Sequence, residues 1–473
     1  MYCRLCEMVS LRAWPHMPYA YYRRGEIIAH ELNKDEFELM LRCDGKQNLE
    51  ESVLLRTLVS NGLLRVLSGP EPHPVDYRFC ANHYFPRINW MITGRCNYNC
   101  LHCFNAKDNL PLTSEFSWDA CVSLLDDAEK CGVHAFTITG GEPLLHPRFM
   151  DIVRGIHQRN MMVYELNTNG TLITQPVLDE MRRIGCRPLM KISFDGVGHH
   201  DWIRNRQGAE QSALNAIRLC LSEDFPVKVQ TNVHRRNVDT ILPTLELMDE
   251  LGVECLRVIR TSESPRWLEN AGDACLAIEE YYGACLTIAE GYLAKPHTMD
   301  VFFWQFLDLF PRSRTYRMRP VAGNCTTHQP NTPVCGHNRS MAAVTASGEL
   351  VPCNQMSGWF EKEGISLGNV KKEGLQQLLL DSVYLDKVCT PVSCVLENNE
   401  RCQRCPYWKF CLGGCRAIAM RFSKDYLACD PAKCTYFHRG WMEKTTQAME
   451  GVAVAEWDRS ADRAVFSGLV ARA

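Results

Sequence analysis

The chain has 473 residues, 46% of them hydrophobic and 23% charged, with a formal net charge of −3. This length predicts about three domains, and the small net charge does not indicate a nucleic-acid or acidic-membrane partner. Charged residues interrupt the first 30 positions, and we find no apolar run of the roughly 18 residues that cross a bilayer. The sequence therefore predicts a cytoplasmic protein with neither a membrane nor a nucleic-acid partner.

The cysteine content is unusual, because the chain has 25 cysteines and no export signal. Disulfide frameworks are typical of short secreted proteins, whereas clustered thiols in a reducing cytosol indicate metal or redox chemistry. Cysteines that stand singly in apolar or helical patterns are instead predicted to be small buried hydrophobes. These are Cys121, Cys186, Cys220, Cys255 and Cys285.

Residues 1–80 are predicted to form a small separate domain. Asn33 can cap a first helix, and Asn48 with Glu51 resembles a capping box for a second helix. Strand-like segments at 21–32 and 63–67 flank these helices. Strands around a pair of short helices indicate a winged-helix-like module. A linker should follow at Pro70, Pro72 and Pro74.

From residue 87 to 295 strand-like and helix-like segments alternate. Such alternation predicts a parallel α/β sheet, open or barrel-like, and six units are fewer than the eight of a closed barrel. The predicted strands are 88–92, 135–139, 162–166, 189–194, 227–233 and 255–259, and the predicted helices include 118–130, 148–159 and 242–251.

Three cysteines, Cys96, Cys100 and Cys103, follow the first of these strands. A four-iron cluster normally takes four thiolates, so this run leaves one iron open to chelation by S-adenosylmethionine (SAM). Reductive cleavage of SAM would give a 5′-deoxyadenosyl radical that abstracts hydrogen. The alternatives are a simple ferredoxin-like site and a structural zinc site with His102 as a fourth ligand. Zinc, however, usually takes paired C-x2-C units, and His102 adjoins Cys103.

The second strand ends in the run Gly140, Gly141, Glu142 and Pro143. Paired glycines allow the backbone to approach a ligand closely, and their carbonyls would accept hydrogen bonds from the SAM ammonium group. An ordinary turn is the alternative interpretation of this run.

With these two motifs in this order, residues 88–295 resemble a radical SAM core. The resemblance implies a partial (β/α)6 barrel, in which Asn169, Ser193 and Asp195 line the SAM pocket. It also implies that His102 takes the place of the aromatic residue that usually precedes the third cysteine. The fifth strand lacks the glycine-rich motif of the family, so the adenine contacts are left open.

Residues 325–440 contain the spacing Cys335-x12-Gly348-x4-Cys353, followed by the run 402–415 with C-x2-C-x5-C-x3-C, and then Cys434. This pattern resembles a SPASM domain, which binds two auxiliary iron–sulfur clusters. The resemblance implies that Cys335, Cys353 and Cys415, with Cys325, hold one cluster, and that the second is held by Cys402, Cys405, Cys411 and Cys434. Cys429 competes with Cys434, and zinc remains the alternative for the C-x2-C pair.

Several other residues stay without a firm role at this point. Cys389 and Cys394 have no assigned place, and the Cys3–Cys6 pair is predicted to be incidental. His199 and His200 are predicted to lie in a surface loop. Asp201 and Arg204 either shape the SAM pocket or cap the following helix, and residues 445–473 carry no motif.

The N-terminal domain resembles the PqqD-type module, which binds the leader of a ribosomally made precursor peptide at a strand edge. Together the three parts resemble a peptide maturase that forms a thioether or a carbon–carbon crosslink, with epimerisation as a further outcome. This implies SAM, three [4Fe–4S] clusters, a precursor peptide and a reductant such as flavodoxin or ferredoxin. The alternatives are a sulfatase-maturase-like or tetrapyrrole-modifying enzyme, and a non-catalytic zinc or iron–sulfur electron carrier.

Overall fold

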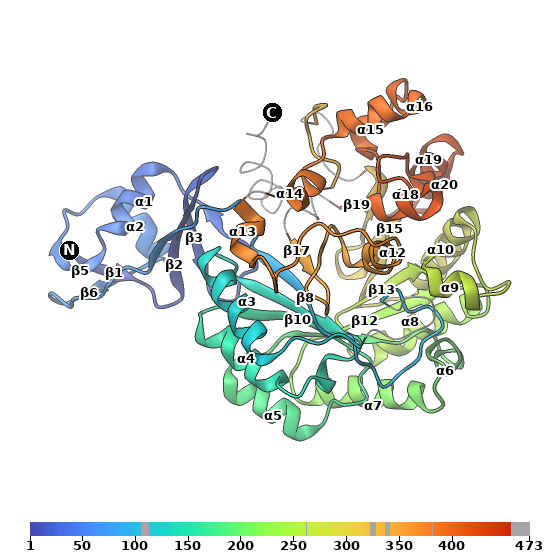
Figure 1. Ribbon diagram of the computed structural model, residues 1–473, viewed down its shortest axis with the longest axis horizontal. Helices are drawn as coiled ribbons and strands as arrows, with labels where there is room; N and C mark the ends of the chain where they lie inside the picture. The colour runs from blue at the N-terminus through green and yellow to red at the C-terminus, as the bar shows by residue number, and fades with distance from the viewer. Residues whose placement is uncertain (106–112, 262, 322–327, 336–340, 381, 456–473) are drawn as a thin grey trace.

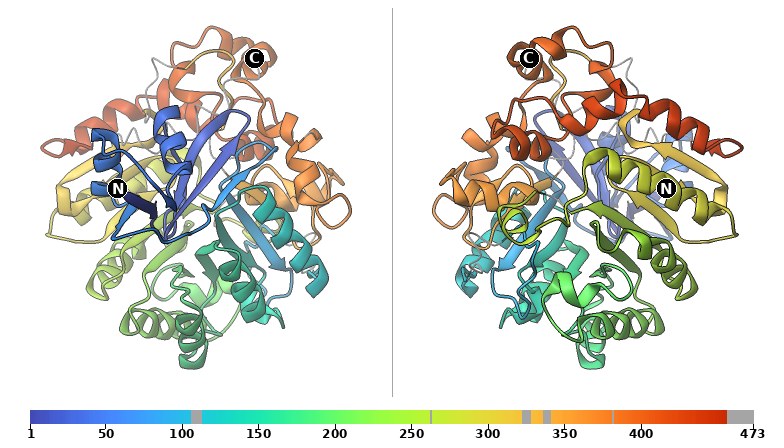
Figure 2. Two further views of the ribbon diagram at one scale, coloured as in Figure 1. Left: turned by 90° about the vertical axis from the view of Figure 1, so that its left-hand side faces the viewer. Right: turned by 90° about the vertical axis from the view of Figure 1, so that its right-hand side faces the viewer.

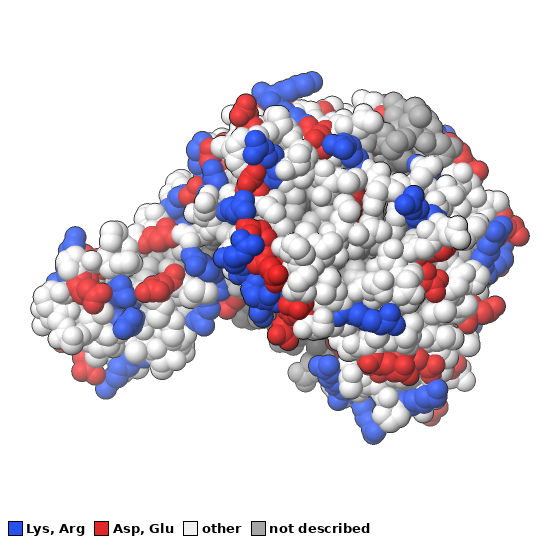
Figure 3. All heavy atoms as spheres, turned by 90° about the horizontal axis from the view of Figure 1, so that it is seen from below, with Lys and Arg blue, Asp and Glu red and all other residues white. Residues whose placement is uncertain are grey.

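The computed structural model describes residues 1–105, 113–261, 263–321, 328–335, 341–380 and 382–455. A small N-terminal domain projects from one side of a larger body built around a curved sheet (Figure 1). Acidic and basic side chains are interspersed on the face in Figure 3. Within the described ranges, no helix is both long enough and apolar enough to cross a membrane.

The N-terminal domain has two small sheets and two helices. Its first sheet has the order β5-β1-β6 and its second the order β4-β3-β2-β7. The elements are β1 (Tyr2–Leu5), β2 (Val9–Trp14), β3 (Met17–Arg23), β4 (His30–Glu31), α1 (Lys34–Leu41), β5 (Asp44–Asn48), α2 (Val53–Ser60), β6 (Leu64–Leu67) and β7 (Tyr77–Phe79).

Two details of this domain differ from the sequence prediction. The prediction that Asn33 caps the first helix is confirmed, because its side chain accepts from the Glu36 N–H at 2.9 Å, and Glu36 completes a capping box. The second helix is capped by Ser52, which accepts from the Leu55 N–H at 3.1 Å, so the prediction of Asn48 was wrong. The strand expected at 21–32 is two strands, β3 and β4, separated by the Gly25 turn.

The proline linker does not end the domain. After it, β7 pairs in parallel with β2, with Leu11 opposite Tyr77. Strand β3 also contacts the larger body, since the Tyr22 hydroxyl donates to the Gly132 carbonyl at 2.8 Å. After the linker, Arg78 on β7 contacts the larger body as well, because its guanidinium donates to Glu129 Oε1 at 2.9 Å. The N-terminal domain is therefore tied to the larger body on both sides of the linker.

The larger body confirms the predicted α/β fold. Six parallel neighbours form its centre, namely β8 (Arg87–Thr93), β9 (Ala135–Gly140), β10 (Met162–Thr168), β11 (Leu189–Ser193), β12 (Val227–Val233) and β13 (Cys255–Arg260). The helices between and after them are α3 (Trp118–Lys130), α4 (Phe149–Gln158), α5 (Gln175–Ile184), α6 (His200–Arg204), α7 (Ala209–Ser222), α8 (Ile241–Glu250), α9 (Pro265–Asn270) and α10 (Ile278–Leu293). Single 3-10 turns lie at Pro143–Leu145, Val238–Thr240, Pro311–Ser313, Arg319–Val321 and Asn354–Met356.

The two faces of the sheet differ in chemistry. Alternate residues such as Leu166, Ile192 and Val229 pack with helix side chains in one continuous apolar core. Helices α3, α4, α5, α7 and α8 cover this outer face (Figures 1 and 2). Side chains alternate along a strand. The strand residues between these outward-facing apolar residues therefore point to the inner face, where many side chains are polar.

The sheet extends beyond the six predicted strands to the order β18-β17-β8-β9-β10-β11-β12-β13-β14-β15-β16-β19. On the β8 side, β17 pairs in parallel with β8, and Met341 lies opposite Arg87. The cysteine-rich region therefore completes the barrel sheet. The added strands are β14 (Asp300–Phe303), β15 (Leu307–Phe310), β16 (Thr315–Met318), β17 (Met341–Val344), β18 (Leu350–Val351) and β19 (Ala453–Val454).

The remaining C-terminal region consists of short helices. Those described from residue 357 onward have four to eight residues each, lengths that are marginal without tertiary support. They are α12 (Ser357–Lys362), α13 (Leu375–Leu380), α14 (Val383–Val388), α15 (Val392–Asn398), α16 (Glu400–Gln403), α17 (Trp408–Cys411), α18 (Arg416–Ser423), α19 (Pro431–His438) and α20 (Trp441–Ala448).

Candidate functional site

The three-cysteine run lies in the loop at the C-terminal end of β8. Burial raises the pKa of the Cys96 thiol to about 12, and the charges of Cys100 and Cys103 contribute to this rise. The three thiols are therefore grouped in space as well as in sequence. Thiolates are the usual ligands of iron–sulfur clusters, so the donor set of this loop fits such a group.

Neighbouring strand ends hold this cysteine loop in place. The Leu101 N–H donates to the Ile203 carbonyl at 2.9 Å, which joins the loop to α6. The Asn169 amide donates to the Asn97 side-chain oxygen at 2.7 Å, and this contact joins the loop to the end of β10. Asn169, predicted as a SAM contact, therefore lies beside the cysteine loop.

The Gly140–Pro143 turn packs against the same loop. The Gly141 N–H donates to Thr93 O at 2.8 Å, and the Glu142 N–H donates to Arg95 O at 2.8 Å. A Cβ at Gly141 would lie 2.2 Å from Arg95 O, so a side chain there would force the two loops apart. Close packing between two loops is thus a reason for glycine, beside the ligand approach expected from the sequence.

Glu142 points into the protein. It is fully buried, and its carboxylate accepts from the Thr168 hydroxyl and the Asn169 N–H, each at 2.8 Å. Burial raises the pKa of Glu142 to about 7, although these donors act to lower it. Glu142 therefore fixes the turn to the end of β10, and its contacts are those of a positioning residue.

Asp195 stands behind the cysteine loop at the centre of a buried network. It follows β11, which ends at the predicted pocket residue Ser193. One carboxylate oxygen pairs with Arg204 Nε at 2.6 Å, and the other accepts from the Asn232 N–H at 2.8 Å. Burial alone would raise the pKa of Asp195, but Arg204 and His200 hold it well below its ordinary value. Asp195 is therefore a buried carboxylate anion.

The same network reaches the proposed cluster ligands through Arg204, whose Nη1 lies 3.9 Å from Cys100 Sγ. The sequence left open whether Asp201 and Arg204 shape the SAM pocket or cap the following helix, and the structure gives the two residues different roles. Asp201 accepts from the Gly208 and Glu210 N–H groups, each at 2.7 Å, at the start of α7. Arg204 belongs to the candidate site, through its contacts with Asp195 and Cys100.

Two histidines complete the surroundings. His200 is fully buried and stacks on Phe194, so the prediction that it lies in a surface loop was wrong. The side chain of Asn232 lies 3.1 Å from His102 Nε2, and burial lowers the pKa of His102 to about 3. His102 is therefore neutral near pH 7.

A second group of thiols joins distant parts of the C-terminal region. Burial raises the pKa of Cys353 to about 12, and the charges of Cys415 and Cys335 act on it. Cys415 and Cys335 thus both lie near Cys353, as the SPASM resemblance implies. Cys325, expected to be the fourth member, lies outside the described residues.

A third group surrounds a cavity of about 30 Å³ in the same region. The five cysteines that line it are Cys402, Cys405, Cys411, Cys429 and Cys434. Cys429 and Cys434, the two candidates for the last ligand of the second auxiliary cluster, therefore line the same cavity. In the described part of the chain, no three His, Cys, Asp or Glu side chains are placed to hold a single metal ion. A four-iron cluster takes its thiolates on different irons, so its ligands do not need to meet at one point.

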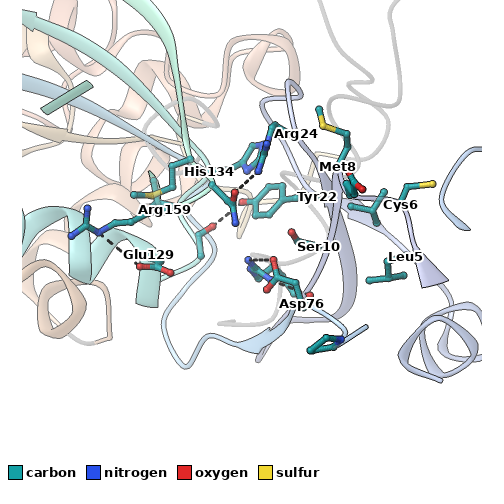
Figure 4. Close-up of a pocket in the computed structure, with 18 of the residues that line it drawn as sticks. Leu5, Cys6, Met8, Ser10, Tyr22, Arg24, Asp76, Glu129, His134 and Arg159 are labelled. Atoms are coloured by element: carbon teal, nitrogen blue, oxygen red, sulfur yellow. Dashed lines mark hydrogen bonds and ion pairs between the residues drawn. The ribbon is translucent and has the colours of Figure 1, made fainter. Parts of the chain in front are cut away.

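A cavity of about 200 Å³ lies away from these cysteines, where the N-terminal domain meets the barrel. Figure 4 shows Arg24, Met8 and Asp76 around it on one side and His134 and Arg159 on the other. His134 directly precedes β9, so this junction pocket is at the N-terminal ends of the strands. Active sites of α/β barrels lie at the C-terminal ends, and the pocket is therefore separate from the cysteine loop.

Comparison with known proteins gives matches to two family models. Residues 90–248 match the radical SAM superfamily, and residues 335–406 match the iron–sulfur cluster-binding domain SPASM. Among curated proteins, the AdoMet-dependent heme synthase of Methanosarcina barkeri is 26% identical over 354 residues, which are 74% of this chain and 96% of that protein. The antilisterial bacteriocin subtilosin biosynthesis protein AlbA of Bacillus subtilis is 23% identical over 421 residues, covering 83% and 86%.

Among solved structures, Streptococcus suis SuiB bound to its precursor peptide SuiA matches the fold with a TM-score of 0.64 and 11% identity. This match covers 91% of the present chain and 99% of that chain. The cysteine loop, the glycine turn and the grouped C-terminal thiols lie within or beside the matched ranges. The chain therefore contains a radical SAM domain over residues 90–248 and a SPASM iron–sulfur cluster-binding domain from residue 335.

Proposed function

We propose that this protein is a radical SAM enzyme that modifies a ribosomally made peptide, forming a thioether or a carbon–carbon crosslink. A [4Fe–4S] cluster with SAM supplies a 5′-deoxyadenosyl radical when both are bound. Cys96, Cys100 and Cys103 would hold that cluster, as their grouping at the end of β8 supports. Arg204 would stabilise the ligand charge of Cys100 through its N–H group.

The remaining site residues position this loop. Glu142 and Asn169 connect the glycine turn, the end of β10 and the cysteine loop. Asp195 keeps Arg204 directed at Cys100 through their ion pair. Gly140, Gly141, Pro143, Ser193 and His102 lie at or next to the same strand ends, where we propose that SAM binds.

Two auxiliary clusters are proposed for the C-terminal region. The grouping of Cys335, Cys353 and Cys415 supports one, with Cys325 as its expected fourth ligand. The cavity lined by Cys402, Cys405, Cys411 and Cys434 supports the other. An external reductant such as flavodoxin or ferredoxin would deliver the electron for SAM cleavage.

The observation that supports a peptide substrate is the extent of the fold match. Residues 87–473 make up only about 82% of the chain (387 of 473), so a match over 91% must include part of the N-terminal domain. The matched SuiB structure holds a precursor peptide. We propose that the N-terminal domain here binds a peptide leader, and that the junction pocket contributes to this contact.

A tetrapyrrole substrate is the second candidate. The heme synthase of M. barkeri is covered over 96% of its length at 26% identity, a higher identity than that to AlbA. Such a substrate would need no leader, so the role of the N-terminal domain separates the two candidates.

The test uses the anaerobically reconstituted full-length protein with SAM and dithionite. Each short peptide encoded beside the gene and iron coproporphyrin III are supplied separately, and products are analysed by mass spectrometry after thiol alkylation. A thioether removes two hydrogens, about 2 Da, and one alkylatable thiol, while a carbon–carbon link removes only the hydrogens. Decarboxylation of the porphyrin with every peptide unchanged would contradict the proposal. Replacing all three of Cys96, Cys100 and Cys103 by alanine should abolish deoxyadenosine formation.

The leader-binding role is tested by point variants, because deleting residues 1–80 would uncover the bottom of the barrel. Trp14 there donates to the Cys131 carbonyl at 3.2 Å. Combined Met8→Ala and Arg24→Ala should weaken binding of the modified peptide about tenfold by removing one apolar and one charged contact. Arg56→Ala, on the exposed side of α2, is the control. Equal binding by both proteins would contradict the role of the junction pocket.

A further inference from the structure

The inner face of the barrel sheet carries more buried positive than negative charge. Glu165 on β10 faces Lys191 Nζ at 3.3 Å and Lys228 Nζ at 3.9 Å. Arg257 on β13 acts on the same carboxylate and on both lysines. Three basic side chains on three adjacent strands thus share one carboxylate, and we refer to these four residues as the inner-face charge cluster.

The strand register places this cluster directly below the candidate SAM site. Lys191 lies opposite Lys228 on β12, and opposite Asn167 on β10. Lys191 precedes Ser193 by two residues, so both point to the inner face and are separated by about 7 Å along the strand. A molecule bound at the cluster would therefore lie within the barrel, next to the strand ends that carry the cysteine loop.

The cluster is largely removed from water. The side chains of Lys191, Lys228 and Glu165 are 15%, 12% and 11% exposed. Burying an ion is costly unless an opposite charge compensates it, and one carboxylate compensates only one of the three cations. Burial, together with the nearby Arg257, lowers the pKa of both lysines, that of Lys228 to about 8. With all four groups ionised, the three cations and one carboxylate leave an excess of two positive charges at this place.

The charges around the cluster do not remove this excess. Arg87 on β8 also acts on Glu165 and adds a further cation. Asp308 on β15 acts with Arg257 but is paired with Arg319 at 2.7 Å. A separate sign of an incomplete site is Asn167, whose Oδ1 atom is buried without a hydrogen-bond partner among the described residues.

We propose that the inner-face charge cluster binds carboxylate groups of the substrate, with Lys191, Lys228 and Arg257 as the recognising cations. Asn167 Oδ1 is placed to accept a substrate N–H beside them. This inference rests on the proposed function in one respect, which is that the substrate enters the barrel below SAM. Peptides bear carboxylates as their ordinary anions, so the occupant is an acidic side chain of the peptide near the residue that is modified.

The test measures binding to the reconstituted holoprotein with SAM present, without turnover. The probes are the capped peptide acetyl-Gly-Glu-Ala-Glu-Gly-amide, its counterpart with glutamine in place of glutamate, and metal-free coproporphyrin III, a tetracarboxylate. Isothermal titration calorimetry should show at least tenfold tighter binding of the glutamate peptide than of the glutamine peptide. The double variant Lys191→Met/Lys228→Met should reduce this ratio to about one. The exposed pair Lys34→Met/Lys295→Met is the control and should leave it unchanged.

A second variant changes the ratio in the opposite direction. Glu165→Gln removes the competing carboxylate, so the preference for the glutamate peptide should increase several-fold, whereas a purely structural role of the cluster predicts a loss. An unchanged ratio in the double lysine variant would overturn the proposal. So would equal binding of the two peptides by the unmodified protein, if coproporphyrin III binding also does not depend on the lysines. Lysine-dependent binding of coproporphyrin III without any peptide preference would support the carboxylate site and contradict the peptide function.

The pH dependence gives an independent readout. Lys228 faces Arg257 and Cys255 on β13, Lys191 on β11 and Glu165 on β10. A bound carboxylate favours the protonated lysine, so its pKa is higher in the complex than in the free protein. Affinity for the glutamate peptide is then full below about pH 8 and falls as the pH rises through 8, by about tenfold between pH 7 and 9. In Lys228→Met this decrease should disappear, and its persistence there would count against the assignment.

Discussion

The barrel and the cysteine segment, which we define as residues 392–415, are stabilised in different ways. The barrel strands and their helices share one continuous core of buried apolar side chains. The cysteine segment has helices of four to seven residues. The buried members of its apolar cluster are Val392 and Val395, with Val334 from outside the segment. Tyr407 and Phe410 are only partly buried against the barrel core. From this difference we expect that the barrel can fold through hydrophobic burial, whereas the cysteine segment needs the contribution of its proposed iron–sulfur cluster.

The largest difference between the two regions is expected when the iron is removed. Treatment with a chelator under anaerobic conditions should raise amide hydrogen exchange in the cysteine segment more than 100-fold, because cluster binding there supplies folding free energy. The amides of β10, β11 and β12 should change less than about threefold. Mass spectrometry of peptic fragments measures both regions in one sample. Equal protection of the cysteine segment with and without iron would show that its apolar contacts suffice.

An intermediate effect is expected where the barrel itself meets a proposed cluster ligand. Arg204→Met removes the N–H donor to Cys100 and leaves Asp195 as an unpaired buried carboxylate. The rate of deoxyadenosine formation should fall about 10- to 100-fold, as for other outer-shell partners of metal ligands. The electron paramagnetic resonance signal of the reduced SAM-binding cluster should also shift.

Arg204→Lys serves as the matched control, since it keeps the positive charge beside Asp195. It should retain most of the cluster signal and recover part of the rate. If the methionine variant kept a normal signal and rate, Arg204 would be only a structural partner of Asp195.

The smallest expected effect comes from removing one serine helix cap in the barrel and one in the C-terminal region. Ser117 caps α3 in the barrel and Ser382 caps the six-residue α14 in the C-terminal region, and each accepts a backbone N–H three residues on. Loss of either cap costs about 1 kcal/mol. Ser382→Ala should speed exchange throughout α14 about fivefold, while Ser117→Ala should affect only the first turn of α3. If Ser117→Ala increased amide exchange equally along the whole of α3, the barrel core would not be stabilising that helix more than the C-terminal region stabilises α14.

Much of the barrel could be predicted because its signal is local. Each predicted strand and helix rests on an apolar period that can be read within a dozen residues, and β12 was predicted with its observed bounds. The radical SAM domain could also be predicted, because the C-x3-C-x2-C spacing of the cysteine loop lies within a dozen residues. The cap predicted at Asn48 was wrong because Asn48 ends β5, where its side chain accepts from the N-terminal amine, and Ser52 caps the helix instead.

Other features depend on contacts that no local pattern shows. Arg204 pairs with Asp195 and reaches Cys100, which lies 104 residues earlier in the chain. His200 is polar by type, yet it is buried because it accepts the Asp195 N–H and stacks on Phe194. The inner-face charge cluster could not be predicted from the sequence, because the strand register alone brings its members together. They are Glu165, Lys191, Lys228 and Arg257.

The pairing of β17 with β8 has a consequence for the way the protein is made. Strand β8 emerges from the ribosome early, but its partner on one side starts at Met341, more than 250 residues later. Until then one edge of the barrel sheet has unpaired backbone groups, and such edges promote association between chains. We therefore expect nascent chains that stop before β17 to aggregate, and the first cysteine loop, which follows β8, to acquire its final surroundings only when the C-terminal region has been synthesised.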